Sequence, residues 1–246
     1  MFPIRDHNPS GRTPYVTFAL IALNAVVFLG YWTSLSDFQI DRLFMTWGLV
    51  PQSLMRGEGL ASIVTSMFLH AGWMHILGNM LFLWIFGDNL EDEMGHGGFL
   101  LFYLLAGLAA ALAQVAMDPL STIPMVGASG AIAGVMGGYL LLFPKARVDV
   151  LFIFIIFFRI FAIPAWIVLG VWFALQLFSG LSVPGDMGGV AYWAHAGGFA
   201  GGLILGLPAF LRRGGRSYWA RTAGHPPHPQ AAYPLSRSNI PRVPRR

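Results

Sequence analysis

The sequence predicts an all-α integral membrane protein that crosses the bilayer six times, and three observations lead to this fold class. The first is composition: 56% of the 246 residues are hydrophobic and only 11% are charged. A soluble domain carries about a quarter charged residues, so this chain has too few charges to cover a soluble core. The second is a series of six apolar runs, and the third is the uneven distribution of arginine and lysine between them.

The six apolar runs are separated by polar residues, prolines and glycines. A helix needs roughly 20 apolar residues to cross a bilayer core of about 30 Å. A long segment, 34–72, joins the first two runs and forms the first outer loop. The segment 146–163 is also apolar, but its uncharged core, 150–158, is too short to cross as a helix, so we predict an interfacial loop there. The predicted spans are 14–33, 73–90, 97–117, 127–143, 164–181 and 191–211.

The basic residues support six spans and give an orientation. With six spans both termini lie on one side, which then holds 13 of the 15 arginines and lysines, and the opposite side holds Arg42 and Arg56. The positive-inside rule makes the first side cytoplasmic. The chain therefore divides into a cytoplasmic segment, 1–13, a six-span domain, 14–211, and a basic tail, 212–246, whose Pro- and Arg-rich composition predicts disorder.

Charge and cysteine content exclude several functions. The net charge of +4 comes mainly from the tail and the flanks of the spans, so membrane orientation explains it better than nucleic-acid binding does. The chain has no cysteine, which excludes disulfides, thiol nucleophiles and cysteine-type zinc sites. We expect neither a cofactor nor a metal, because the histidines and the asparagine of the spans come without a carboxylate ligand.

Polar side chains fall at one depth of the predicted bundle. The even-numbered spans all begin near the outer face, and there they carry His75 and Asn79, Ser129, and His195 respectively. Polar and ionisable residues within a membrane are costly and indicate function by default. Three spans that are distant in the sequence thus bring a hydroxyl, an imidazole and hydrogen-bond donors to the same level.

Glycines at four-residue spacing indicate how two of these spans approach. Span four carries one such series and span six another, a pattern that lets membrane helices pack closely. Packing of the two series would bring Ser129 and His195 side by side. Glycine spacing alone would indicate only ordinary helix packing; a histidine at the level of the serine favours catalysis. The two series are Gly130, Gly134 and Gly138, and Gly198, Gly202 and Gly206.

The residue types match nucleophilic catalysis. A serine needs a base to become a nucleophile, and histidine is the usual base. The oxyanion that forms needs preorganised donors, which the backbone amide of Ser129 and the side chains of His75 and Asn79 could supply. Asp118 and Asp186 lie in outer loops, so a Ser-His dyad is favoured over a Ser-His-Asp triad. Gln176, in span five, is interpreted as a residue that joins two helices through a hydrogen bond, with an unknown partner.

Three motifs carry a family resemblance: HILGN at 75–79, GASGAIAG at 127–134 and AHAGGFAGG at 194–202. In this order and in these spans they resemble the rhomboid intramembrane serine proteases over most of residues 14–211. The resemblance implies a six-helix rhomboid bundle of bacterial inner-membrane type, with Ser129 as nucleophile, His195 as base and later acid, and His75 and Asn79 as oxyanion partners. It also implies that Gly127 shapes the oxyanion loop and that Gly198 and Gly202 pack against span four.

The resemblance further implies the substrate class and leaves alternatives open. Family members cleave single-span membrane proteins near the outer edge of the transmembrane helix. Some relatives carry a tyrosine four residues after the nucleophile, against which the histidine stacks; here this position is Ala133, so His195 must be oriented otherwise. The alternatives are an inactive relative that binds membrane clients and, with less support, a transporter, although no internal repeat of the kind found in transporters is evident.

Overall fold

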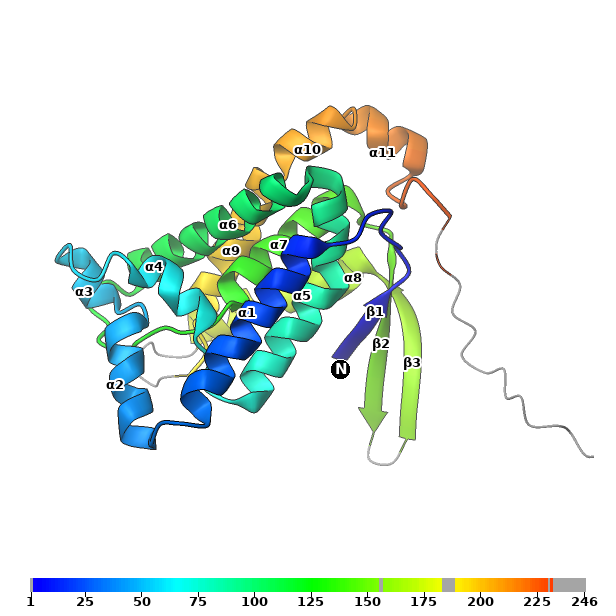
Figure 1. Ribbon diagram of the computed structural model, residues 1–246. Coiled ribbons are helices and arrows are strands. Elements are labelled where there is room, and N and C mark those ends of the chain that lie inside the picture. Colours follow the sequence, from blue (N-terminus) through cyan, green and yellow to red (C-terminus); the bar gives the residue numbers. More distant parts are fainter. Residues whose placement is uncertain (1, 155–156, 183–188, 230, 232–246) are drawn as a thin grey trace, which may run out of the picture.

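The computed structural model describes residues 2–154, 157–182, 189–229 and 231. A bundle of helices fills its centre, a group of short helices lies at one end, and a small sheet lies at the other (Figure 1). The bundle confirms the predicted all-α membrane fold. Its six main helices are α1 (Tyr15–Trp32), α5 (Trp73–Met94), α6 (His96–Met117), α7 (Ser129–Leu142), α8 (Ala165–Ser182) and α9 (Tyr192–Leu205).

Each main helix coincides with a predicted span. Three of them, α1, α6 and α8, are each long and apolar enough to cross a membrane. The helix α9 reaches that length when it is taken together with α10 (Leu207–Arg212), which follows it. The helix α5 qualifies when it is joined to the preceding segment 62–68, from which it is bent by 97°. The remaining helix, α7, is apolar but has only 14 residues. It lies in the interior, among α5, α6 and α9, where a short helix is covered by its neighbours (Figure 1).

The predicted first outer loop is a set of short helices. Leu49 forms an isolated bridge with Met125, which ties this loop to the segment that precedes α7. The Tyr31 hydroxyl at the end of α1 donates to the carbonyl of His70, at 2.5 Å, and holds the loop's return to α5. The loop's elements are α2 (Asp37–Trp47), α3 (Pro51–Met55), α4 (Ser62–Thr65) and the 3₁₀ helix η1 (Ser66–Phe68).

Glycines allow α6, α7 and α9 to meet at their backbones. A Cβ on Gly198 would collide with the carbonyl oxygen of Gly130, and a Cβ on Gly202 with that of Gly134. The two glycine series therefore pack against each other, with Gly198 on Gly130 and Gly202 on Gly134. The same α7 residues also make room for α6: a Cβ on Gly130 would stand 2.6 Å from the Cβ of Ala110 on α6.

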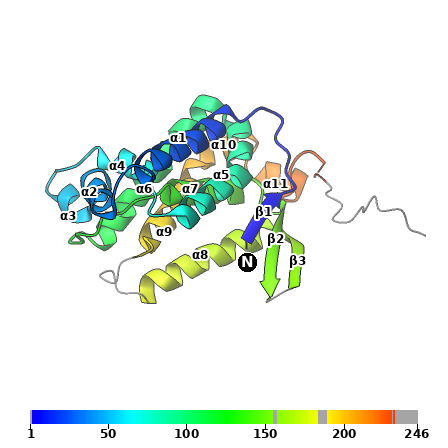
Figure 2. The same ribbon diagram turned by 60° about the horizontal axis from the view of Figure 1, so that its bottom comes forward.

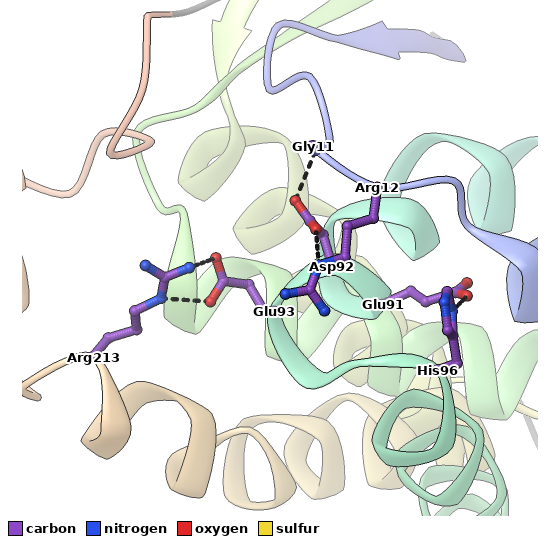
Figure 3. Close-up of polar contacts among 7 residues, drawn as sticks. All are labelled: Gly11, Arg12, Glu91, Asp92, Glu93, His96 and Arg213. Atoms are coloured by element: carbon purple, nitrogen blue, oxygen red, sulfur yellow. Dashed lines mark hydrogen bonds and ion pairs between the residues drawn. The ribbon is translucent and has the colours of Figure 1, made fainter.

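Carboxylates at the end of α5 bind the elements around it (Figure 3). Glu91, which is 1% exposed, accepts the backbone N–H groups of Val16 and Thr17 at 2.8 Å each, and also the Thr17 hydroxyl. The first N–H groups of a helix have no partner within it. Glu91 thus caps α1 from another helix, and the Nδ1 atom of His96 contacts the same carboxylate at 2.5 Å.

The two neighbouring carboxylates of α5 extend these contacts. Asp92 accepts the backbone N–H of Gly11 at 2.8 Å and pairs with Arg12 at 3.5 Å. Arg213 is the residue that follows α10, and its guanidinium donates two hydrogen bonds to Glu93 (Figure 3). The acidic residues at the end of α5 therefore hold the start of α1 and the end of α10 at the same end of the bundle.

The segment 146–163, predicted to be an interfacial loop, is instead a β-hairpin. The strands β2 (Arg147–Phe154) and β3 (Phe157–Pro164) pair antiparallel, and β1 (Phe2–Asp6) pairs with β2 on the other side. Val148 and Val150 belong to the buried hydrophobic core that the helices form. The loop prediction was wrong because the length criterion excludes a spanning helix but does not exclude a strand.

Buried acidic groups attach β1 to the rest of the protein. Asp149 of β2 accepts hydrogen bonds from Arg5 at 2.7 Å and from His7 at 2.8 Å. Burial by itself would raise the pKa of Asp149, but these two partners outweigh it and hold the pKa below its usual value. Burial raises the pKa of Asp6 to about 8, against the lowering effect of the hydrogen bond from the Tyr139 hydroxyl.

The tail predicted to be disordered begins with ordered structure. The helix α11 (Arg216–Thr222) follows α10, and Tyr218 on it is buried. Residues 230 and 232–246 lie outside the described residues. The division into a segment 1–13, a domain 14–211 and a tail 212–246 stays a prediction.

Candidate active site

Ser129 and His195 are in hydrogen-bond contact. Ser129 is the first residue of α7, and His195 lies in the first turn of α9, next to the close approach of the two helices. The Oγ of Ser129 and the Nε2 of His195 are 2.8 Å apart, although 66 residues separate them in the chain. This is the geometry of a nucleophile and its general base.

The other ring nitrogen of His195 contacts the next helix. Its Nδ1 lies 2.7 Å from the side-chain oxygen of Gln176 on α8. The ring of Trp172, also on α8, lies 5.7 Å from the imidazole between centroids and is tilted by 36° to it. In Figure 2, α8 runs along one edge of the bundle, from the sheet towards the start of α9. The histidine is therefore held between α7 and α8.

The sequence alone predicts a helix-joining role for Gln176 but not its partner, because a helical pattern does not say which neighbouring helix a side chain meets. One signal was available: Gln176 is the single amide side chain in a mostly apolar helix. Polar side chains in such a position usually face the interior of the bundle.

His75 and Asn79 line the same cavity as the serine, and Gly127 lies beside it. A Cβ on Gly127 would stand 2.7 Å from the Nε2 of His75 and 3.6 Å from the Oγ of Ser129, so both side chains approach this glycine. Gly127 has φ +126°, a conformation that favours glycine, and its N–H donates to the carbonyl of Ser66. The segment before α7 is thereby held against η1 and brings its backbone next to the serine.

Two side chains of α5 offer donors at this place. The Nδ1 of His75 accepts the backbone N–H of Ala71 at 3.3 Å, which leaves the ring proton on Nε2. The Nδ2 of Asn79 is buried and, among the described residues, has no hydrogen-bond partner. An unpaired buried donor is costly, and this one lies on the wall of the same cavity as Ser129, where it is available to bind an acceptor.

A cavity of about 1090 Å³ opens onto these groups. It receives the side chains of Ser129, His195, His75 and Asn79, and its wall also includes polar groups such as Gln114. Its volume matches that of cavities that hold a ligand of considerable size. The cavity therefore provides room for a peptide segment and for water at the serine.

Metal ligation has little support in the described part of the chain, where no group of three histidine, cysteine, aspartate or glutamate side chains is arranged to hold an ion. The residues of the cavity are suited to hydrogen bonding and proton transfer. That the protein uses no metal and no cofactor stays a prediction.

Comparison with known proteins identifies the family. The family model of the rhomboid domain matches residues 57–212, more than half of the chain. The chain belongs to the rhomboid family. The match covers α5 to α10 and so includes every residue of the site described above.

Three relatives illustrate the breadth of this rhomboid's similarities. "Rhomboid protein 1, mitochondrial" of Saccharomyces cerevisiae is 29% identical over 78% of this chain and 52% of its own length. "Rhomboid protease GluP" of Bacillus subtilis is 32% identical over 79% of this chain and 36% of its own length. "Rhomboid-related protein 2" of Mus musculus is 37% identical over 60% of this chain and 47% of its own length. The chain thus spans about half or less of the length of these relatives.

The family and the apolar helices make this rhomboid an integral membrane protein. The relatives come from bacteria, fungi and animals, so they do not assign the predicted bacterial inner membrane. That membrane and the cytoplasmic placement of both termini stay predictions.

Proposed function

We propose that this rhomboid is an intramembrane serine endopeptidase that uses Ser129 and His195 as a catalytic dyad. The observation that carries the proposal is the 2.8 Å contact between the Ser129 Oγ and the His195 Nε2 on the wall of a large cavity. A relative that is named a rhomboid protease, from Bacillus subtilis, supports the reaction class. The proposed substrates are single-span membrane proteins, cut near the outer end of their transmembrane helix.

The reaction begins at the serine. His195 Nε2 accepts the hydroxyl proton while the Ser129 Oγ attacks the carbonyl carbon of the scissile peptide bond. The tetrahedral intermediate carries a negative oxygen, which needs donors already in position. The donors that we propose for it are the Nδ2 of Asn79, the Nε2–H of His75 and the backbone N–H of Ser129, whose residues line the same cavity.

The second half of the reaction uses the same groups in reverse. His195 gives its proton to the leaving amine, and the peptide bond breaks to leave an acyl-enzyme on Ser129. Water from the cavity then attacks the ester while His195 again accepts a proton. The protein must admit water to a site among membrane helices, and the open cavity provides that access.

A reconstitution experiment tests the proposal. The protein is placed in liposomes with a single-span test substrate whose outer helix end carries small and helix-breaking residues. We expect cleavage by the wild type and none above background by Ser129→Ala or His195→Ala. The matched controls are Ser217→Ala and His228→Ala, which remove the same side chains far from the cavity and should cleave as the wild type does.

A fluorophosphonate probe gives a second readout, because it should label the wild type at Ser129 and fail to label Ser129→Ala. Undiminished cleavage by purified Ser129→Ala would contradict the mechanism. A wild type that folds but neither cleaves nor takes up the probe would indicate the alternative, an inactive relative that binds membrane clients.

A further inference from the structure

The contact between Gln176 and His195 has a chemical consequence for the dyad. The two ring nitrogens of a neutral histidine differ, since one carries a proton and the other carries a lone pair. A general base must present the lone pair to the nucleophile. Here Nε2 faces the Ser129 Oγ at 2.8 Å, so the proton has to reside on Nδ1.

Gln176 selects that tautomer. Its side-chain oxygen lies 2.7 Å from Nδ1, and a carbonyl oxygen can only accept. The contact is a hydrogen bond when Nδ1 carries the proton and becomes a repulsion between two acceptors when it does not. The amide therefore favours the form of His195 whose Nε2 can accept the serine proton.

Gln176 and Trp172 also restrict the orientation of the ring. They are four residues apart on α8, so they lie on the same face of this helix. Trp172 lies against the imidazole, and Gln176 binds its Nδ1 edge. One contact limits the tilt of the ring and the other limits its rotation, which keeps Nε2 directed at Ser129.

We propose that Gln176 is the positioning residue of the dyad. It accepts the Nδ1–H of His195 and so holds the imidazole in the tautomer and orientation that allow Nε2 to take the proton of Ser129. This inference rests on the proposed function. It assigns to the uncharged Gln176 the place that a carboxylate takes in soluble serine proteases. A neutral amide suits a site among membrane helices, because a buried carboxylate would need compensation for its charge.

Three variants test the kinetic part. Gln176→Leu keeps the size of the side chain and removes the acceptor, and Gln176→Glu keeps an acceptor at the same length. Leu175→Ala is the matched control, since this neighbouring side chain is 55% exposed. For Gln176→Leu we expect kcat to fall about 10-fold or more, the worth of one hydrogen bond, with KM unchanged. We expect Gln176→Glu to keep most of kcat and Leu175→Ala to match the wild type.

A spectroscopic measurement tests the tautomer independently of turnover. Nitrogen-15 NMR of histidine-labelled protein distinguishes Nδ1–H from Nε2–H, and His195→Ala identifies the resonance that belongs to His195. We expect Nδ1–H in the wild type and in Leu175→Ala, and loss of that single form in Gln176→Leu. A purely structural role for Gln176 would lower the melting temperature without changing the tautomer.

The outcomes separate this inference from the proposed function. If the wild type cleaves through Ser129 but Gln176→Leu keeps both its kcat and the Nδ1–H form, the positioning role is refuted and the protease stands. If the wild type does not cleave, the proposed function fails, and the NMR result still decides whether Gln176 sets the tautomer of His195.

Discussion

The closeness of α7 and α9 can be tested by adding one methyl group. In Gly202→Ala the new Cβ would stand 2.5 Å from the Cα of Gly134, where carbon atoms ordinarily keep about 3.5–4.0 Å. The neighbouring atoms are backbone and cannot rotate away, so the helices must separate by about 1 Å. Overpacking of this kind costs about 1–3 kcal/mol of folding free energy.

The same displacement should reach the dyad. A shift of about 1 Å would lengthen the 2.8 Å contact between Ser129 and His195 beyond hydrogen-bond range. Misplacement of catalytic groups by about 1 Å can cost about 100-fold in rate. We therefore expect Gly202→Ala to be less stable and to cleave about 100-fold more slowly than the wild type.

Gly170→Ala is the matched control for this variant. A Cβ on Gly170 of α8 meets nothing within 4 Å, so the same change should be neutral or slightly stabilising through the helix propensity of alanine. Thermal denaturation in detergent measures stability, and cleavage in liposomes measures rate. If Gly202→Ala melts and cleaves like Gly170→Ala, close backbone packing at Gly202 does not control the stability or the rate.

Three further changes should each affect a different contact. Asn79→Ala should slow cleavage about 100-fold or more with an intact dyad, since one oxyanion donor is lost; an unchanged kcat in the same liposome assay would exclude Asn79 from that role. Glu91→Ala should lower the free energy of unfolding by about 2–4 kcal/mol, because buried N–H groups of α1 lose their acceptor; chemical denaturation measures this, and Glu91→Gln, which keeps one oxygen, should lose less. The attachment of β1 should depend on pH in two ranges. Asp149, with a lowered pKa, stabilises the fold above its usual value near 4, and this contribution disappears as pH falls through the lowered value. Asp6, with a pKa raised to about 8, contributes stability that is fully present below its usual value near 4 and is lost progressively as pH rises from there through about 8. Hydrogen exchange of β1 reports both effects, and Asp6→Asn should abolish the loss that accompanies rising pH; persistence of that loss in Asp6→Asn would contradict the assignment.

The sequence alone determined the class of fold and predicted which two groups react. Apolar runs of spanning length predict helices whatever their partners are, because the bilayer core sets the length and requires every backbone hydrogen bond to be made within the helix. Likewise, Ser129 and His195 stand out because polar groups among membrane helices are costly, and the resemblance to rhomboids then suggested their roles.

Only the tertiary structure decided which groups meet. Periodicity placed glycines on two helices but did not show that Gly130 of α7 also faces α6. The sequence pattern did not show that Gln176 binds His195, and it did not show that strand β1 pairs with the apolar segment after α7. The physical reason is the same in each case. Length and periodicity are properties of one segment, whereas a hydrogen bond or a backbone contact depends on the relative position of two segments, which the packing of the whole chain sets.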